Sequence, residues 1–585
     1  MRVPSCTVQA TPVASGIAIG RVMLIHKKNF GDGNTAISAD EVQLELERFH
    51  TALEVTKKQL QDLQEKLRRK LRDTEAGIFD AHLLLVEDYT MTNEVERSIT
   101  EDMVDAESAI IRAVDKFVAA FSAVEDIYLR ERAVDIRDVG QRIITNLSEG
   151  EEKLDYDEPR VVIASTLTPS ETIGMDREKV LGFAVETGSA TSHTAILARS
   201  LQLPAVVGVP KELLDSLTVA DKIIVDGFSG KIIINPDAAT EEAYRLKSKE
   251  AEKIYRQLRG ESDLRAVTTD GFTIEIAANV EVQEDYSAIR KNGAGGIGLF
   301  RTEFIFMDES NLPDEDEQFE IYKKLMISAG NDPVTIRTMD IGGDKLNCGI
   351  VRSEEQNPFL GLRGIRLCLR ERADLFKTQL RALMRAGVHG NMQIMLPMVS
   401  CMEELLEARK IIGELKNELT SQGVPFNDAI PLGVMIETPA AALTADRFAL
   451  EADFFSIGSN DLIQYTIAAD RSNERVAHLY QPGHPAILRL IRFTVEEALK
   501  QNIPVAVCGQ IAEDLSMIPF LVGLGVNELS MSPGSMPLVK KLIRSLSMHE
   551  CGELAEKAML CNNSTDVMQL SRQMIARCAP ELLDL

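Results

Sequence analysis

The sequence predicts an α/β protein of several domains that ends in a (β/α)8 barrel. Three features predict it: a helical segment that interrupts a small strand-rich region, a polar helix, and then eight strand-like segments alternating with helical or loop stretches. With 585 residues, the chain is long enough for about three or four domains. We expect an α/β domain in residues 1–37 and 148–237, a helical insertion in 38–147, a linker helix in 238–262 and the barrel in 263–585.

The helical insertion starts at a capping signal, because Ser38 is followed three residues later by Glu41. Apolar residues then recur at helical spacing and form one stripe: Val42, Leu46, Phe49, Leu53, Leu60, Leu63, Leu67 and Leu71. Residues 75–126 hold thirteen Asp or Glu and three basic residues. This acidic arm predicts either a docking surface for a basic partner or simply a solvated helical face, and charge alone does not separate the two.

Short strands flank this insertion. "RVVIAST", "KVLGFAVE", "PAVVG" and "KIIVDG" lie in residues 148–237, and residues 1–37 have the same strand-rich, Gly-punctuated character. The two segments therefore predict one small α/β domain with the helices inserted into it. The polar stretch 238–262 predicts a connecting helix.

The barrel prediction depends on eight strand-like segments in order: "TIEIAANV", "GGIGLF", "VTIRTMD", "MQIMLPMV", "LGVMIET", "DFFSIG", "VAVCG" and "NELSMS". Active sites of (β/α)8 barrels lie at the carboxyl ends of the strands. Five of the eight segments deliver polar or ionisable residues there: Arg301, Arg337, Asp340, Glu437, Asn460, Asp461 and Cys508. Arg363 and Arg471 lie in the loops that follow.

Converging arginines predict a small substrate rich in anionic oxygens, because a guanidinium matches carboxylate and phosphate groups. A single arginine at such a rim is also typical of a structural salt bridge, so the joint arrangement carries the prediction. Glu437 and Asp461 on neighbouring strands predict a Mg²⁺ site, since that ion takes one or two carboxylates and completes its shell with water and substrate oxygens.

Three residues have both a structural and a chemical interpretation. His193 stands where "ATSHTAILARSL" turns from a hydroxyl-rich loop into a helix, so its ring is either a hydrogen-bonded structural group or a nucleophile that accepts a phosphoryl group. Thr168 opens "TPSE" and is either only an N-cap or a candidate catalytic residue. Cys508 is either a small buried hydrophobe or a proton donor to an enol carbon.

Composition excludes several classes of protein. A net charge of −26 disfavours binding to nucleic acid, and no apolar run is long enough for membrane insertion. The eight cysteines form no CxxC pair, which argues against a zinc site or a disulfide framework. Pro4, Pro12 and Gly16 interrupt the first residues where a secretory leader would need a continuous apolar core, so we expect a cytoplasmic protein.

Across nearly its whole length, the chain resembles enzyme I of the phosphoenolpyruvate-dependent sugar phosphotransferase system. The motifs that carry the resemblance are "LTPSET", "TSHTAILARSLQLPAVVG", "GIGLFRTEFIFMD", "IRTMDIGGDK", "NPFLGLRGIR", "IETPAAA", "FFSIGSNDLIQYTIAADR" and "HLYQP". The resemblance implies that a phosphoryl group is taken from phosphoenolpyruvate (PEP) onto His193 and passed to a histidine of the phosphocarrier HPr. Because His193 must meet the barrel in one step and the carrier in the next, we expect the α/β domain to swivel relative to the barrel. It further implies Mg²⁺ bound by Glu437 and Asp461, and Cys508 as the donor of the proton that the enolpyruvate receives.

The same resemblance implies PEP binding by Arg301, Arg337, Asn460 and Arg471, with Arg363 nearby. It implies docking of HPr on the helical insertion, where His82 lies, and a homodimer formed through the barrel.

Some positions depart from the family pattern. Gly188, Ser189 and Ala190 precede "TSHT" where sugar-system members commonly have Gly-Gly and then often a basic residue, and Gln510 and Glu513 also differ from the usual residues. These differences keep open an alternative function, a nitrogen-branch-like phosphorelay protein that senses the ratio of PEP to pyruvate.

Overall fold

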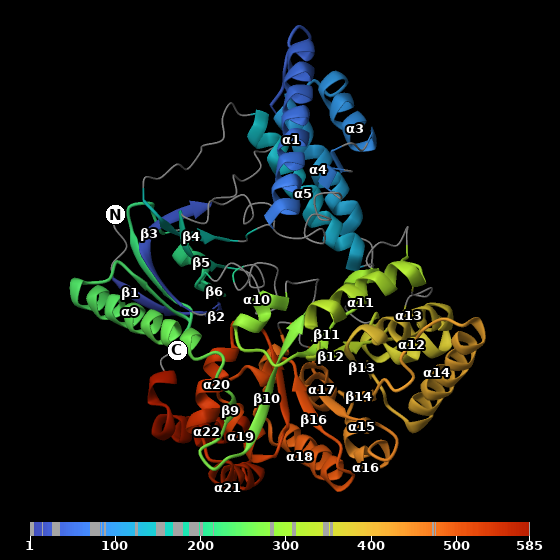
Figure 1. Ribbon diagram of the computed structural model, residues 1–585. Helices are drawn as coiled ribbons and strands as arrows, with labels where there is room; N and C mark the ends of the chain where they lie inside the picture. Colours follow the sequence, from blue (N-terminus) through green and yellow to red (C-terminus); the bar gives the residue numbers. More distant parts are fainter. Residues whose placement is uncertain are drawn as a thin grey trace. The chain divides into compact units, whose positions relative to one another are not determined.

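The computed structural model confirms a multidomain α/β architecture with a C-terminal barrel (Figure 1). The chain forms two compact units, Met1–Glu250 and Ala251–Leu585. The described residues are 5–14, 16–25, 35–70, 82–83, 85–86, 89–122, 127–147, 158–165, 167, 179–186, 198, 203–214, 216–280, 286–306, 312–342, 350, 355–470, 473 and 475–583. No helix among them is both long and apolar enough to span a bilayer.

The first unit contains an eight-stranded sheet in the order β1-β8-β7-β3-β4-β5-β6-β2. Its strands are β1 (Cys6–Gln9), β2 (Thr11–Ala14), β3 (Ile17–Ile25), β4 (Arg160–Ala164), β5 (Val180–Val185), β6 (Ala205–Val207), β7 (Lys222–Asp226) and β8 (Lys231–Ile234). The short helix α8 (Lys211–Leu214) lies between β6 and β7. Strand β3 pairs in parallel with β4 and antiparallel with β7. Segments before and after the helical insertion therefore share one sheet.

The helical insertion has its own apolar core. Its helices are α1 (Val42–Lys70), α3 (Tyr89–Thr100), α4 (Ala106–Ser122) and α5 (Ile127–Leu147). The apolar stripe predicted for the first helix contributes Phe49 and Leu60, both buried, to that core. The Glu41 carboxylate accepts hydrogen bonds from the backbone N–H and hydroxyl of Ser38, and α1 begins directly after this turn.

Helix α9 (Ala238–Gly260) follows β8. Its first turns are tied to the sheet by ion pairs, with Lys222 Nζ 2.6 Å from Glu241 Oε1 and Lys247 Nζ 3.0 Å from Asp226 Oδ2. Burial opposes ionisation of Asp226, but hydrogen bonds from Lys247 and Ser229 outweigh it and lower its pKa.

The second unit is a closed barrel of eight parallel strands, and the short strand β9 (Ala266–Val267) pairs antiparallel with β10 beside it. The barrel strands are β10 (Thr273–Val280), β11 (Ile297–Phe300), β12 (Pro333–Arg337), β13 (Asn391–Leu396), β14 (Leu432–Ile436), β15 (Phe455–Gly458), β16 (Val505–Cys508) and β17 (Glu528–Met531). All eight coincide with the strand-like segments of the sequence. Pairing of β10 with both β11 and β17 closes the barrel.

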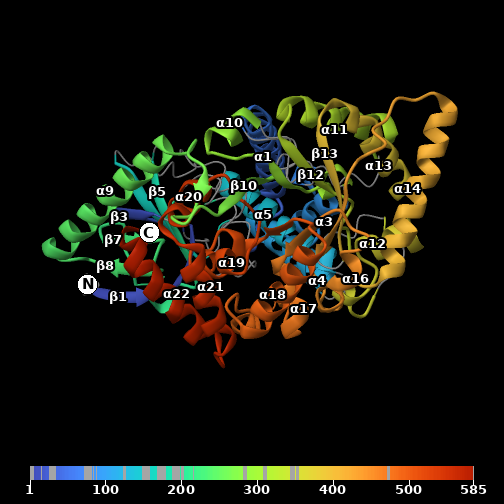
Figure 2. The same ribbon diagram turned by 60° about the horizontal axis from the view of Figure 1, so that its bottom comes forward.

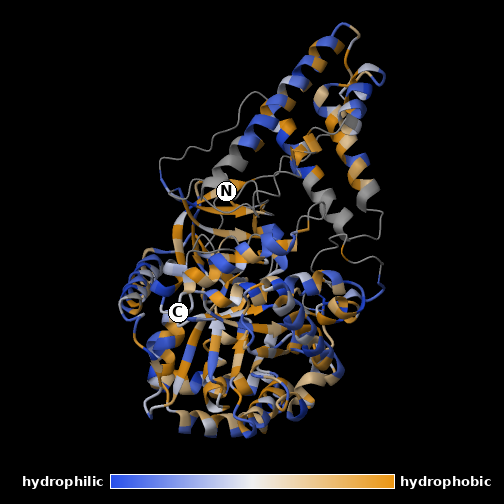
Figure 3. Ribbon diagram, turned by 45° about the vertical axis from the view of Figure 1, so that its right-hand side comes forward, coloured by the Kyte–Doolittle hydropathy of each residue, from blue (hydrophilic) through white to orange (hydrophobic). Residues whose placement is uncertain are grey.

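Helices surround the barrel strands (Figure 1, Figure 2). They are α10 (Tyr286–Lys291), α11 (Glu315–Ala329), α12 (Ile365–Arg370), α13 (Ala373–Ala386), α14 (Met402–Gln422), α15 (Pro439–Leu443), α16 (Ala445–Phe448), α17 (Ser459–Ile467), α18 (Pro485–Lys500), α19 (Ile518–Gly523), α20 (Met536–Ser545), α21 (Met548–Met559) and α22 (Ser564–Cys578). Hydrophobic residues run along the strands, whereas the helices alternate between hydrophobic and hydrophilic faces (Figure 3).

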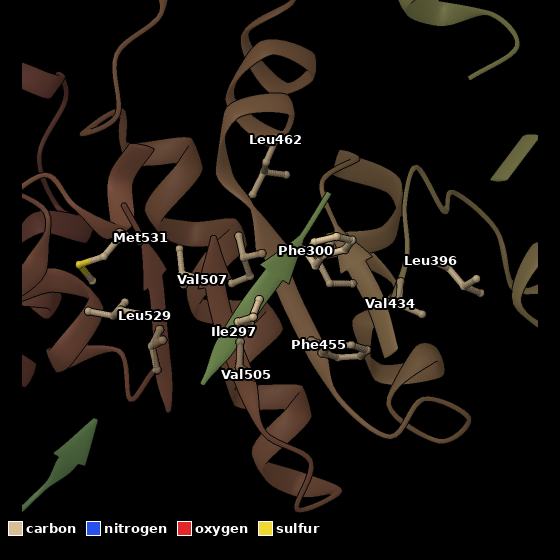
Figure 4. Packing of buried hydrophobic residues seen from close by; sticks show 14 of the residues in the cluster. Ile297, Phe300, Leu396, Val434, Phe455, Leu462, Val505, Val507, Leu529 and Met531 are labelled. Carbon is tan, nitrogen blue, oxygen red and sulfur yellow. The ribbon is translucent and has the colours of Figure 1, made fainter. Parts of the chain in front are cut away.

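The main barrel core lies between strands and helices. Ile297, Phe300, Val434, Phe455 and Val507 are buried in it (Figure 4). A second, smaller cluster is formed by Leu299, Met395, Met435, Phe454 and Cys508. Side chains alternate between the two faces of each strand, so these residues point into the barrel while their neighbours face the helices. Cys508 therefore has an apolar environment on the inner side of the barrel.

Candidate active site

Arg363 is the centre of the charged network at the carboxyl ends of the strands. Its side chain is fully buried and bonds both carboxylates bidentately: Nε and Nη2 donate to Asp340 (both 3.1 Å), and Nη1 and Nη2 donate to Asp461 (2.9 and 3.0 Å). Nη1 also donates to the Tyr465 hydroxyl at 3.2 Å. A guanidinium has five N–H donors. All five are used, so Arg363 has none left for a ligand in this conformation.

Arg337 extends the network towards β11. This residue ends β12, and its Nη2 lies 2.6 Å from Glu303 Oε1 while Nη1 lies 3.1 Å from Asp340 Oδ2. Nη1 also contacts Met435 Sδ at 3.7 Å. The buried Nε has no hydrogen-bond partner among the described residues. Arg337 thus keeps one N–H donor that a substrate oxygen can use.

Asp340 is shared by both arginines and is fully buried. Burial opposes the positive charge of Arg337 and of Arg363, but Glu303 and Asp340 raise the pKa of Arg337, and Asp340 and Asp461 raise that of Arg363. Both guanidinium groups are therefore charged, and the ion pairs run without interruption from Glu303 to Asp461.

Glu437 follows β14 directly and is 1% exposed. Its Oε1 accepts a hydrogen bond of 2.6 Å from the backbone N–H of Met398, a residue held at φ 58°. No described residue donates a hydrogen bond to Oε2. Burial raises the pKa of Glu437, and the negative charges of Asp461 and Asp340 raise it further.

This carboxylate environment fits a divalent cation. Glu437 has one oxygen without a donor, and a nearby cation would offset the repulsion from Asp461 that raises its pKa. Within the described part of the chain, no cluster of three or more His, Cys, Asp or Glu side chains could hold a metal ion. Mg²⁺, however, usually takes only one or two carboxylates from the protein, and water and substrate oxygens complete its coordination.

Cys508 ends β16 at the same rim and is 2% exposed. Burial raises the pKa of its thiol to about 11. At neutral pH the group is therefore a protonated thiol, which is the form that can donate a proton. The hydroxyl of Ser456 donates a hydrogen bond to Sγ at 3.3 Å, and Sγ lies 3.6 Å from the carbonyl oxygen of Ile457.

Asn460 and Arg301 complete the described part of the rim. Asn460 Oδ1 accepts hydrogen bonds from the Tyr480 hydroxyl (3.4 Å) and the Gln510 backbone N–H (3.1 Å). Arg301 follows β11 and is half-buried. The side chain of Gln510 is exposed, and its backbone N–H is the group that contacts Asn460.

Glu513, another departure, joins the loop after β16 to the loop after β17. Its Oε2 accepts hydrogen bonds from the hydroxyls of Ser532 (2.5 Å) and Ser535 (3.2 Å). This carboxylate therefore ties two loops together beside the rim.

His193, Thr168 and Arg471 lie outside the described residues, so their roles stay predictions. His82 lies in the helical insertion, is 1% exposed and has Nδ1 3.8 Å from Asp138 Oδ2. It is part of the interior of the insertion rather than of its surface.

Sequence reasoning missed Glu303, Ser456 and Tyr465, and it did not assign a role to Asp340. Asp340 gave a signal, because it lies at the end of a predicted strand. Glu303, Ser456 and Tyr465 gave none, since their roles depend on neighbours that are distant in sequence: Arg337, Cys508 and Arg363.

Three family profiles match the chain: "PEP-utilising enzyme, N-terminal" over residues 9–132, "PEP-utilising enzyme, mobile domain" over 156–230, and "PEP-utilising enzyme, PEP-binding domain" over 256–548. The chain belongs to the family of PEP-utilising enzymes.

Its relatives within that family include two proteins named phosphoenolpyruvate-protein phosphotransferase. The protein of Listeria innocua serovar 6a is 42% identical over 569 residues, which is 96% of this chain and 98% of that protein. The protein of Staphylococcus carnosus is 40% identical over 565 residues, again 96% and 98%. The solved structure titled "NMR solution structure of Enzyme I (nEIt) protein" is 40% identical, with a TM-score of 0.37, and covers 42% of this chain and 99% of its own. The three family profiles and the two relatives named phosphoenolpyruvate-protein phosphotransferase confirm the resemblance to enzyme I that the sequence motifs predicted.

Proposed function

We propose that this chain is a phosphoenolpyruvate-protein phosphotransferase that transfers the phosphoryl group of PEP to its own His193 and then to a histidine of an HPr-like carrier, releasing pyruvate. The observation that carries the proposal is the network that joins Glu303, Arg337, Asp340, Arg363 and Asp461 at the carboxyl ends of the barrel strands. PEP carries a carboxylate and a phosphate, and a guanidinium matches both groups.

In this proposal, the residues at the rim divide the work of binding. The free Nε–H of Arg337, together with Arg301, Asn460 and Arg471, binds the oxygens of PEP. Arg363 holds Asp461 in place, because both oxygens of that carboxylate accept hydrogen bonds from its guanidinium. Glu437 and Asp461 would hold Mg²⁺, which supplies positive charge that offsets the charge of the phosphoryl oxygens.

The chemical step breaks the bond between phosphorus and the enol oxygen and forms a bond between phosphorus and an imidazole nitrogen of His193. The electron pair of the broken bond stays on the enol oxygen, so the product is the enolate of pyruvate. Cys508 then donates the S–H proton to the methylene carbon of the enolate, and water later returns a proton to the thiolate. Thr168, near the start of the mobile domain, is the remaining candidate for a role in this transfer.

A basic carrier fits the acidic arm of the helical insertion. Arg97 Nη2 and Lys116 Nζ both lie 2.7 Å from Glu94 Oε1, so one carboxylate of the arm pairs with two of its three basic residues. Glu101 and Glu107 remain exposed. The excess of acidic over basic residues in this arm supports docking of a carrier with a positively charged face. The proposal also includes Mg²⁺ as cofactor, a homodimer through the barrel and a cytoplasmic location.

Transfer from labelled PEP separates this function from the regulatory alternative. With ³²P-PEP, Mg²⁺ and a histidine-bearing HPr-like carrier, we expect label to pass through the protein to the carrier over many turnovers, with pyruvate released in step. A protein that only senses the ratio of PEP to pyruvate would label itself yet pass the label on slowly. Self-labelling without turnover to any HPr-like carrier would therefore favour the regulatory function.

A further inference from the structure

The thiol of Cys508 has one hydrogen-bond donor among the described residues, the Ser456 hydroxyl at 3.3 Å. Ser456 is 1% exposed and lies on β15, next to the strand that carries Cys508. Its hydroxyl makes no other hydrogen bond in the described structure. A buried hydroxyl is costly unless it is paired, so the position of Ser456 is explained by its contact with sulfur.

The serine on the opposite neighbouring strand, β17, does not contact the thiol in this way. Ser530 on β17 is the backbone partner of Cys508 and is fully buried, but its hydroxyl donates to Asn279 Oδ1 at 2.7 Å. Two serines thus flank the thiol, and only one donates a hydrogen bond to it.

We propose that Ser456 is a positioning residue whose hydroxyl stabilises the thiolate that forms when Cys508 gives its proton to the enolate of pyruvate. This inference rests on the proposed function. In that step the S–H bond breaks, a C–H bond forms at the methylene carbon, and the electron pair stays on sulfur. The carbonyl oxygen of Ile457 can accept a hydrogen bond from the thiol but cannot stabilise a thiolate, whereas the O–H of Ser456 can donate a hydrogen bond to the thiolate.

The hydrogen bond from Ser456 is important because most of the side chains packed around Cys508 are apolar. Cys508 packs against Leu299, Met395, Met435 and Phe454, none of which solvates a charge. Charges in the surroundings also act on the thiol: Arg337 and Arg301 favour the thiolate, and Glu437 opposes it. Burial raises the pKa of Cys508, and the hydrogen bond from Ser456 acts in the opposite direction.

The test measures the fraction of thiolate through its nucleophilicity. The full-length protein is treated at pH 8 to 9 with iodoacetamide, and alkylation of the Cys508 peptide is followed by mass spectrometry. We expect Ser456→Ala to slow this alkylation by about tenfold, because a lost hydrogen bond to the charged form raises the thiol pKa. Ser456→Thr should restore much of the rate, and the matched control Ser530→Ala should leave it near that of the wild type.

The direction of the change separates the proposal from a packing effect. Removing the Ser456 hydroxyl opens space beside sulfur, so better access alone would speed alkylation. Equal or faster alkylation of Ser456→Ala would overturn the proposal. A second readout is steady-state release of pyruvate from PEP with an HPr-like carrier in excess as the phosphoryl acceptor. Here Ser456→Ala should lower kcat and leave KM for PEP nearly unchanged. If the wild type failed to use PEP, the proposed function would be wrong, while the alkylation result would still decide the role of Ser456.

Discussion

Replacing Arg363 with methionine is expected to lower the free energy of unfolding of the barrel by about 3–5 kcal/mol. The guanidinium makes five hydrogen bonds, four of them to Asp340 and Asp461. Methionine fills similar space but leaves two carboxylates in a buried site without their main counter-charge. Removing one partner of a buried ion pair is costly because the remaining charge stays desolvated.

Urea unfolding followed by circular dichroism measures this loss, since the chain has no tryptophan. Arg366→Met, three residues further along the chain on α12, is the matched control. Arg366 is partly exposed and lies 3.9 Å from Glu404, so we expect a change of about 1 kcal/mol or less. Equal effects of the two substitutions would contradict the central place given to Arg363.

Glu437→Gln is expected to have the opposite profile, with a large loss of activity and no loss of stability. Cation-assisted stabilisation of transition-state charge is worth several kcal/mol, so phosphorylation by PEP should fall by about 10²- to 10³-fold. Burial and the charges of Asp461 and Asp340 disfavour the ionised form of Glu437. A neutral amide removes that repulsion, so the free energy of unfolding should stay equal or rise.

The measurements are single-turnover labelling with ³²P-PEP over a range of Mg²⁺ concentrations, and urea unfolding without metal. Glu404→Gln is the control, because Glu404 is a buried carboxylate that accepts hydrogen bonds from the backbone of Ser400 and Cys401 and is not bonded to Arg337 or Arg363. It should cost stability and spare labelling. A Glu437→Gln protein that labels like the wild type would remove Glu437 from the proposed metal site.

The sequence was sufficient to place residues at strand ends, because strand periodicity and chain order determine where each barrel strand stops. Arg337, Glu437 and Cys508 are therefore found where the pattern predicts them. Which of these side chains form hydrogen bonds and ion pairs with one another could not be predicted in the same way. Arg363 uses its donors on Asp340, which is 23 residues away, and on Asp461 and Tyr465, which are 98 and 102 residues away. The two distant partners come within reach only through the fold of the barrel.

The hydrogen bonds of Ser456 with Cys508 and of Met398 with Glu437 could not be predicted either, because they too join different strands or loops. In the sequence, Ser456 is simply a small residue in a buried strand. Its contact with Cys508 depends on the register of β15 against β16. Met398 gave no signal that its backbone N–H donates to Glu437, since its left-handed conformation is set by the turn after β13.

The site of phosphorylation tests the whole account most directly. The full-length wild type, His193→Ala and the control His549→Ala, which changes an exposed histidine on α21, are incubated with ³²P-PEP and Mg²⁺, and acid-labile label is mapped by peptide. We expect label on the His193 peptide in the wild type and in His549→Ala, and none in His193→Ala. Acid-labile label that persists in His193→Ala would contradict this expectation.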